Sequence, residues 1–416
     1  MTSDSTPGPI RHGTPAYRRI SVALLMAGFA TFALLYGVQP LLPLFTREFG
    51  VGAAQASLAV SLATGPMALA LIPAGIVSDR LGRRPLMTAS LFAAAFVTIL
   101  SAALPGWGTL LAMRVLVGVA LSGIPAIAMA YIAEELDAAS IGAAMGLYIA
   151  GSAIGGMVGR LGVSLLAEAV GWRGALALLG AAGLVAAALF RRLAPPSRGF
   201  TTRTHDLASL AGGWRRLLSD AALPWLYVEA FLLMGTFITV YNFVGFRLLA
   251  PPYALSQSAV GAIFLLYIVG SFSSAWVGAI AGRVGRRRIF WMPIAALIAG
   301  LALTATRPLP LVIAGIAVVT AGFFGAHSVA SSWVGRRARG DRGLAASLYL
   351  FFYYLGASLL GSGGGIAWSR GAWPAVTVYT IGLSGIALAV AVRLARVAPL
   401  PENLPPPDPA RSMPPG

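Results

Sequence analysis

The chain has 416 residues, of which 58% are hydrophobic and only 10% are charged, and its mean hydropathy is +0.81. A soluble protein carries about 25% charged residues, so this chain has too few charges to cover the surface of two or three soluble domains. All 30 basic residues are arginine, a composition that suggests a GC-rich bacterial genome, and the absence of cysteine excludes disulfides and iron–sulfur clusters. The composition predicts a polytopic membrane protein.

Twelve stretches of the sequence are long and apolar enough to be membrane spans. A spanning helix needs about 20 mainly apolar residues to cross a hydrocarbon core about 30 Å thick. In chain order the predicted spans are Ile20–Thr46, Phe49–Ser78, Pro85–Met113, Val115–Ala133, Ala138–Gly159, Gly174–Phe190, Ala221–Phe246, Ser256–Ala281, Ile289–Thr306, Leu309–Val334, Gly343–Ser369 and Ala372–Val392. Six spans therefore fall in residues 20–190 and six in residues 221–394, with a polar linker at 191–220.

The distribution of arginine predicts the orientation, because cytoplasmic loops are enriched in basic residues. With both termini inside, 23 of the 30 arginines are cytoplasmic, 5 lie in outer loops, and Arg114 and Arg160 lie inside spans. A charge of +17 then reflects membrane orientation, not a nucleic-acid partner. Residues 1–19 lack a secretory pattern and form a predicted cytoplasmic tail, and the Pro-rich residues 395–416 are predicted to be disordered. We expect a multi-pass protein of the bacterial inner membrane.

The two halves of the chain repeat each other at matched places. Gly75–Arg84, between spans two and three, matches Gly278–Arg287, between spans eight and nine, with an offset of 203 residues. Trp172 and Trp373 each open the last span of their half and are 201 residues apart. A duplication of six helices places a substrate path between the halves, as in transporters that work by alternating access. The sequence predicts an all-α membrane fold with two pseudo-symmetric six-helix bundles.

The loop Gly75–Arg84 resembles motif A of the major facilitator superfamily, and its second copy lies where that family has one. The stretches Tyr131–Glu135, Met145–Ile149 and Ser347–Leu350 are similar to the drug/proton antiporter branch, which includes arabinose-efflux-permease-like proteins. The resemblance extends from about Arg11 to Arg396 and implies the twelve-helix fold of the family. It also implies export by exchange with protons.

In the family, motif A is a cytoplasmic gate that stabilises the outward-open state. The matching residues in this sequence are Gly75, Asp79, Arg80, Gly82, Arg83 and Arg84 in the first copy, and Gly278, Arg283, Gly285, Arg286 and Arg287 in the second. The acidic segment at residues 134–137 ends span four and is the expected partner of the first copy. Gly282 replaces the aspartate in the second copy, so we expect a weaker half-gate there.

Charged or titratable groups inside spans are candidates for proton coupling, because a charge near the bilayer centre is costly and usually functional or paired. Arg114 lies in a stretch that resembles motif B, whose arginine is linked to proton transfer. Glu229 is the carboxylate that lies well inside a span, and burial favours the neutral form of such an acid. His327 in span ten is a second candidate proton site.

Polar and aromatic groups of the first spans, and tyrosines of spans five and eleven, are expected to face a central cavity. The candidates are Tyr36, Gln39, Tyr241, Asn242, Tyr148 and Tyr353. Glycines at 151, 155 and 159 line one face of span five and permit close helix packing. This position resembles motif C of antiporters, although its proline is absent and Gly156 stands there. Arg160 lies near the outer end of span five, where we favour contact with the membrane interface over contact with an anionic substrate.

These features together predict a secondary active transporter and not an enzyme. The chain has no lysine and hence no phosphate-binding loop for ATP, and it shows neither a metal cluster nor a requirement for a cofactor. We expect a monomer that moves a small organic solute, such as a drug-like compound, a sugar or a metabolite, by proton-coupled efflux. A proton-coupled importer or a uniporter remains an alternative, as does a membrane sensor or scaffold that does not transport.

Overall fold

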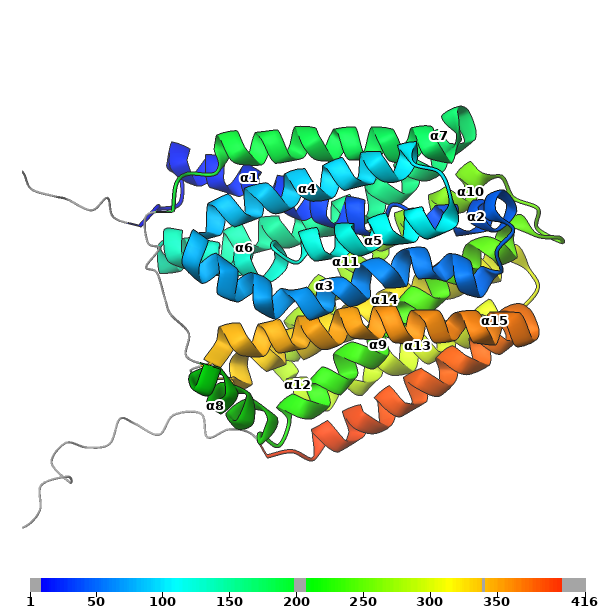
Figure 1. Ribbon diagram of the computed structural model, residues 1–416. Coiled ribbons are helices and arrows are strands. Elements are labelled where there is room, and N and C mark those ends of the chain that lie inside the picture. Colours follow the sequence, from blue (N-terminus) through cyan, green and yellow to red (C-terminus); the bar gives the residue numbers. More distant parts are fainter. Residues whose placement is uncertain (1–8, 198–206, 339–340, 399–416) are drawn as a thin grey trace, which may run out of the picture.

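The computed structural model describes residues 9–197, 207–338 and 341–398, and these residues form a bundle of long helices (Figure 1). The predicted tails and linker lie partly outside these ranges, at residues 1–8, 198–206 and 399–416. Helix α1 begins and helix α15 ends at the same end of the bundle, which we call the terminal end; the opposite end is the far end.

The first bundle begins with a helix that is interrupted near its far end. Its elements are α1 (Pro15–Tyr36), the 3-10 helix η1 (Gln39–Leu41), α2 (Leu42–Phe49), α3 (Ala53–Leu81), α4 (Arg83–Ala103), α5 (Trp107–Leu121), α6 (Pro125–Glu135) and α7 (Ala138–Leu193). The segments α1, η1 and α2 form one continuous path through the bundle, as do α5 and α6. The interruption at η1 falls where Pro40 removes a backbone donor.

The second bundle repeats this arrangement. Its elements are α8 (Leu207–Leu218), α9 (Leu223–Leu249), α10 (Gln257–Ala262), η2 (Ile263–Leu266), α11 (Tyr267–Val284), α12 (Arg286–Ile289), α13 (Trp291–Thr304), α14 (Leu309–Arg337) and α15 (Arg342–Ala395). Helix α8 is amphipathic and lies across the terminal end, whereas the long helices of this bundle run between the two ends (Figure 1).

Ten helical stretches in the described part of the chain are long and apolar enough to cross a membrane, and two of them cross it twice. Helix α7 has 56 residues and turns at Gly171, and α15 has 54 residues and turns at Gly371 and Ala372. The residues that follow these turns are Trp172 and Trp373, as the repeat predicts. The described residues therefore form twelve segments suited to span a membrane, in two six-helix bundles, as the sequence predicts.

Small residues allow α7 to lie directly against α1. A Cβ atom at Gly151, Gly155 or Gly159 would collide with the main chain of α1, at Phe29 in the case of Gly155. The second bundle repeats this contact, because a Cβ atom at Gly356 of α15 would collide with the main chain of α9. Such contacts bring two backbones close enough to maximise van der Waals attraction where lipid removes the hydrophobic driving force.

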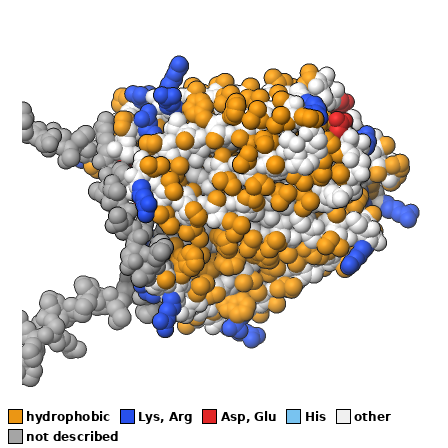
Figure 2. All heavy atoms as spheres, in the orientation of Figure 1, with side chains coloured by type: hydrophobic (Ala, Val, Ile, Leu, Met, Phe, Trp, Pro, Cys, Tyr) orange, Lys and Arg blue, Asp and Glu red, His pale blue; other side chains and the backbone are white. Residues whose placement is uncertain are grey.

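The outer surface suits a hydrocarbon environment. Figure 2 shows hydrophobic side chains spread over the face between the two ends, with arginine side chains gathered toward its edges. Large apolar side chains such as Leu69, Phe272, Trp276 and Val378 are more than half exposed. In water a surface of this kind would mark an interaction or aggregation site, and in a membrane it contacts lipid tails.

Hydrogen bonds join the two bundles in the half of the molecule nearer the far end. Ser164 Oγ donates to the carbonyl of Gln257 at 2.6 Å, and Gln257 Nε2 donates to the carbonyl of Pro40 at 2.7 Å. Ser358 Oγ donates to the carbonyl of Ser61 at 2.8 Å. These contacts hold the two bundles together on that side.

A pair of glycine substitutions on α7 tests the close contact with α1. Gly155→Ala should lower the free energy of unfolding by about 1–3 kcal/mol, because the added methyl group meets the main chain of α1. Gly162→Ala is the matched control, since a Cβ atom there has no neighbour within 4 Å, and it should raise that free energy by about 0.5–1 kcal/mol through helix propensity. Unfolding by SDS in mixed micelles measures both, and equal effects of the two substitutions would contradict the described packing.

Candidate functional site

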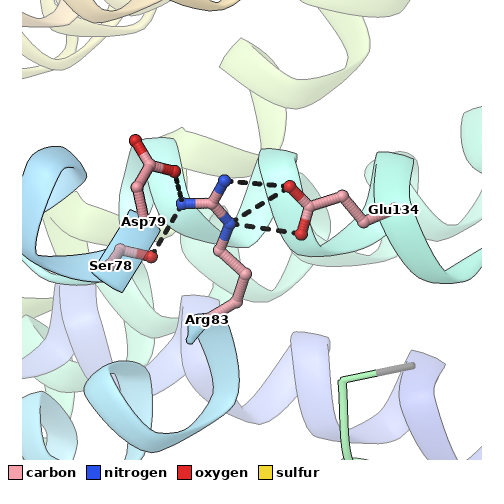
Figure 3. A network of polar contacts seen from close by, with 4 residues as sticks. All are labelled: Ser78, Asp79, Arg83 and Glu134. Atoms are coloured by element: carbon pink, nitrogen blue, oxygen red, sulfur yellow. Dashed lines mark hydrogen bonds and ion pairs between the residues drawn. The ribbon is translucent and has the colours of Figure 1, made fainter. Parts of the chain in front are cut away.

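Arg83 is the centre of a charged cluster at the terminal end (Figure 3). Gly82 separates α3 from α4 with a φ of 93°, a conformation that favours glycine, so Arg83 lies beside the last turn of α3. Its Nη1 lies 2.5 Å from Asp79 Oδ1 and donates to Ser78 Oγ at 2.9 Å. Its Nη2 and Nε donate to the carboxylate of Glu134 at 2.9 and 3.2 Å. The expected pairing of motif A with the acidic end of span four is confirmed for Arg83 and Glu134.

The other residues of the first motif copy have different surroundings. Arg84 Nη2 donates to the carbonyl of Arg191 at 2.7 Å and so joins α4 to the last turn of α7. Arg80 is exposed at the end of α3. A Cβ atom at Gly75 would have no described neighbour within 4 Å, so no close helix contact is seen there.

The second motif copy forms the same turn as the first copy, but Gly282 replaces the aspartate of the first copy. Gly285 has a φ of 103°, which matches the turn at Gly82. Arg286 donates to a serine hydroxyl of α14 at 3.0 Å, and Arg287 donates at 2.7 Å to a main-chain carbonyl that follows α15. Arg283 is exposed, and Gly278 faces a serine hydroxyl of α14. These hydrogen bonds join helices within the second bundle.

Arg114 of α5 satisfies the main chain at the interruption of the first span. It is 1% exposed and donates to the carbonyls of Ala59 at 2.9 Å, of Leu34 at 3.1 Å and of Leu35. The last carbonyls of a helix lack partners within that helix, and α1 ends at Tyr36. Arg114 therefore fixes the end of α1 relative to α3 and α5.

A cavity of about 150 Å³ lies between the two bundles, with walls from α1, α7, α9, α11, α14 and α15. Tyr36 and Tyr353 line it, as the sequence predicts, and so does His327. The predicted cavity residues that do not line it are Gln39, Tyr148, Tyr241 and Asn242, all of which are buried. Most of the remaining wall is apolar or aromatic.

Arg160 of α7 reaches this cavity and begins a chain of hydrogen bonds between the bundles. Its Nε donates to Gln39 Oε1 at 2.6 Å, and its Nη1 donates to the carbonyl of Gly156 at 2.6 Å. Because an arginine only donates, Gln39 presents its oxygen here, and its Nε2 donates to Asn242 Oδ1 at 2.7 Å. Gln39 and Asn242 are 203 residues apart, the offset of the repeated loop. This hydrogen bond therefore joins matched places of the two bundles.

The expectation that Arg160 contacts the membrane interface is wrong, since its side chain is buried and lines the cavity. Sequence reasoning also missed the aromatic wall formed by Phe237, Tyr267 and Phe323. In the sequence, this wall is indicated only by the many aromatic residues of spans seven, eight and ten. Their number does not show which of them face inward.

Glu229 of α9 is fully buried, and neither of its carboxylate oxygens has a hydrogen-bond partner among the described residues. Tyr349 of α15 lies within electrostatic range of it. The Tyr349 hydroxyl forms a 2.9 Å hydrogen bond with Nδ1 of His327, which lines the cavity. Tyr349 is thus hydrogen-bonded to one predicted proton-coupling residue, His327, and lies near another, Glu229, without a hydrogen bond to it.

Comparison with known proteins decides the family. The model of the Major Facilitator Superfamily matches residues 24–361. The chain belongs to the major facilitator superfamily. It moves a solute across a membrane, as this family of transporters does, and its curated relatives are named as transporters, not enzymes.

Two similar curated proteins match nearly the whole chain, and a third matches part of it. The uncharacterized MFS-type transporter YybF of Bacillus subtilis is 44% identical over 95% of this chain and 98% of its own. The inner membrane transport protein YnfM of Escherichia coli is 42% identical over 93% of each chain. The multi-drug resistance efflux pump PmrA of Streptococcus pneumoniae is 32% identical over 39% of this chain and 41% of its own.

Solved structures of low identity share the superfamily fold. A bacterial homologue of the human lysosomal transporter Spinster aligns over 92% of this chain and 98% of its own, with a TM-score of 0.76 at 16% identity. The nucleoside transporter NupG aligns over 91% of this chain and 100% of its own, with a TM-score of 0.72 at 15% identity. These likenesses concern the fold.

A double-mutant cycle tests the charged cluster at the terminal end. Arg83→Gln and Glu134→Gln should each lower the free energy of unfolding, and the pair should show a coupling of about 1–3 kcal/mol because the two side chains share partly buried hydrogen bonds. Arg80→Gln is the control, since Arg80 is exposed, and it should not couple to Glu134→Gln. Unfolding by SDS measures the four free energies, and additive effects at Arg83 and Glu134 would contradict the described contacts.

Proposed function

We propose that this superfamily member exports a small organic solute from the bacterial cytoplasm in exchange for protons. The observation that carries the proposal is the carboxyl group of Glu229, which lies inside α9 without a hydrogen-bond partner among the described residues. A buried carboxylate ion without donors is costly, so in this proposal Glu229 is the group that takes up a proton. It releases the proton when water or a cation reaches it in another conformation.

The connection from Glu229 to the cavity supports coupling between proton and solute. Tyr349 lies near Glu229 and is hydrogen-bonded to His327, whose ring stacks on Phe323 in the cavity wall. A solute that displaces this ring changes the surroundings of Tyr349 and hence of Glu229. In this proposal Glu229 carries the proton, His327 senses the occupied cavity, and Arg114 holds the end of α1 that forms the opposite wall.

The way the bundles meet supports alternating access. We propose that residues 20–190 and 221–394 move as two bodies joined by the linker 191–220, with the terminal end in the cytoplasm. The Arg83 cluster and the remaining motif A residues then form a gate on the cytoplasmic side. Opening the far end requires the loss of contacts such as those between Ser164 and Gln257.

The direction of transport is proposed from the similarity to PmrA, which is named as an efflux pump and matches part of this chain. Import by a proton-coupled or uncoupled route is the alternative, and Gly156 at the position of the antiporter proline favours it. In either case the transporter is proposed to work as a monomer without a cofactor.

Substitution of Glu229 tests the proposed coupling. Solutes that shift the thermal stability of the purified protein, from a screen of sugars, organic ions and lipophilic cations, are added to liposomes that contain the protein and a pH-sensitive dye. We expect solute-dependent proton movement with the native chain and none above protein-free liposomes with Glu229→Gln, whereas solute exchange at equal pH continues.

The matched control for this experiment is Glu48→Gln, because Glu48 is an exposed carboxylate near the far end. It should leave proton movement within the error of the native value. Proton movement that persists in Glu229→Gln would overturn the proposed role of this residue. A solute that moves with no proton in the native protein would indicate a uniporter.

A further inference from the structure

Among the described residues, the charge of Arg160 has no counter-ion in the cavity. Arg160 is 2% exposed, and its described hydrogen bonds go to the neutral side chain of Gln39 and to a main-chain carbonyl. Within the part of the chain that the structure describes, no carboxylate forms an ion pair with it. A guanidinium stays protonated in proteins, so the cavity wall carries a positive charge that these neutral contacts do not cancel.

Aromatic rings surround this charge and extend away from it. The Cζ atom of Arg160 lies 4.4 Å from the ring centre of Tyr36 and 5.1 Å from that of Tyr267. Farther along the wall, the rings of Phe237 and Phe323 are stacked, with 4.0 Å between their centres. The cavity therefore has one cationic point on an aromatic surface.

We propose that the cavity binds an organic anion with a flat apolar body, such as an aromatic carboxylate. The anionic group accepts charge-assisted hydrogen bonds from Arg160, and the body lies against the rings of Phe237 and Phe323. This inference rests on the proposed function, because it assigns the substrate class of the same transport site.

The wall explains why other solutes are disfavoured. A lipophilic cation would lie near an uncompensated guanidinium, and like charges at close range in a low-dielectric site repel strongly. A sugar carries hydroxyl groups on all sides and needs many hydrogen-bond partners. Besides Arg160, the polar side chains of the lining are two serines (Ser152 and Ser274), three tyrosines and His327, and the rest of the lining is apolar. Ser152 already donates to a carbonyl of its own helix.

A matched series of ligands tests the proposal on the native protein. The probes are benzoate, benzyl alcohol and benzylamine, which share one ring but are anionic, neutral and cationic at neutral pH. We expect benzoate to bind the purified chain in lipid nanodiscs about 10- to 100-fold more tightly than benzyl alcohol, the range of a hydrogen bond to a charged group. Benzylamine should bind more weakly than benzyl alcohol, and equal or reversed affinities would overturn the proposal.

Arginine substitutions test whether Arg160 causes the preference for benzoate over benzyl alcohol. Arg160→Gln should remove the advantage of benzoate over benzyl alcohol, and Arg160→Lys should retain part of it. Arg370→Gln, which removes an exposed arginine near the far end, is the control and should retain all of it. If Arg160→Gln does not fold, the comparison with Arg160→Lys and the ligand series still decide the outcome.

Binding and transport separate this inference from the proposed function. Benzoate that binds through Arg160 but moves no protons in liposomes would support the anion site and contradict proton-coupled transport. The protein could instead transport a neutral or cationic solute together with protons, at the same rate in Arg160→Lys as in the native chain. That result would overturn the anion site but not the proposed function.

Discussion

Gly155 lies against the main chain of α1 at Phe29, and Gly356 lies in the same way against the main chain of α9 at Phe231. These contacts fix the distance between paired helices in a setting where lipid supplies no hydrophobic force to join them. Because α1 and α7 lie this close, Gln39 of the interrupted first span comes within hydrogen-bond range of Arg160 one turn farther along α7. The central cavity and the contact between the bundles both depend on that approach.

Three ionisable side chains, those of Arg114, Arg160 and Glu229, are buried in the bundle and differ in their hydrogen-bond partners. Arg114 donates to a main-chain carbonyl of α3 and to carbonyls at the end of α1, and so stabilises the fold. Arg160 has one side-chain partner and faces a cavity, which leaves its charge available to a ligand. Glu229 has no hydrogen-bond partner among the described residues, which suits a group that changes its protonation state. Arg114 and Arg160 are the same residue type, so their different surroundings in the bundle account for the difference between them.

Composition and hydrophobic runs were enough to predict twelve spans, because each span must satisfy its own backbone and present apolar side chains to lipid. The repeat predicted the matched turns before Trp172 and Trp373, and charge predicted the pairing of Arg83 with Glu134. The place of Arg160 was not predictable in this way. It depends on the rotation of α7 and on the interruption of α1, which are set by packing between helices distant in sequence.

Alternating access requires the two bundles to open the two ends in turn around the cavity. The chain has no cysteine, so spin labels can be introduced without a background. One pair, Glu48→Cys with Arg370→Cys, reports on the far end, and another, Arg80→Cys with Arg342→Cys, reports on the terminal end. Double electron–electron resonance in nanodiscs should show the two distances changing in opposite directions on acidification, an effect that Glu229→Gln removes. Distances that stay constant, or that change in the same direction, would contradict the account.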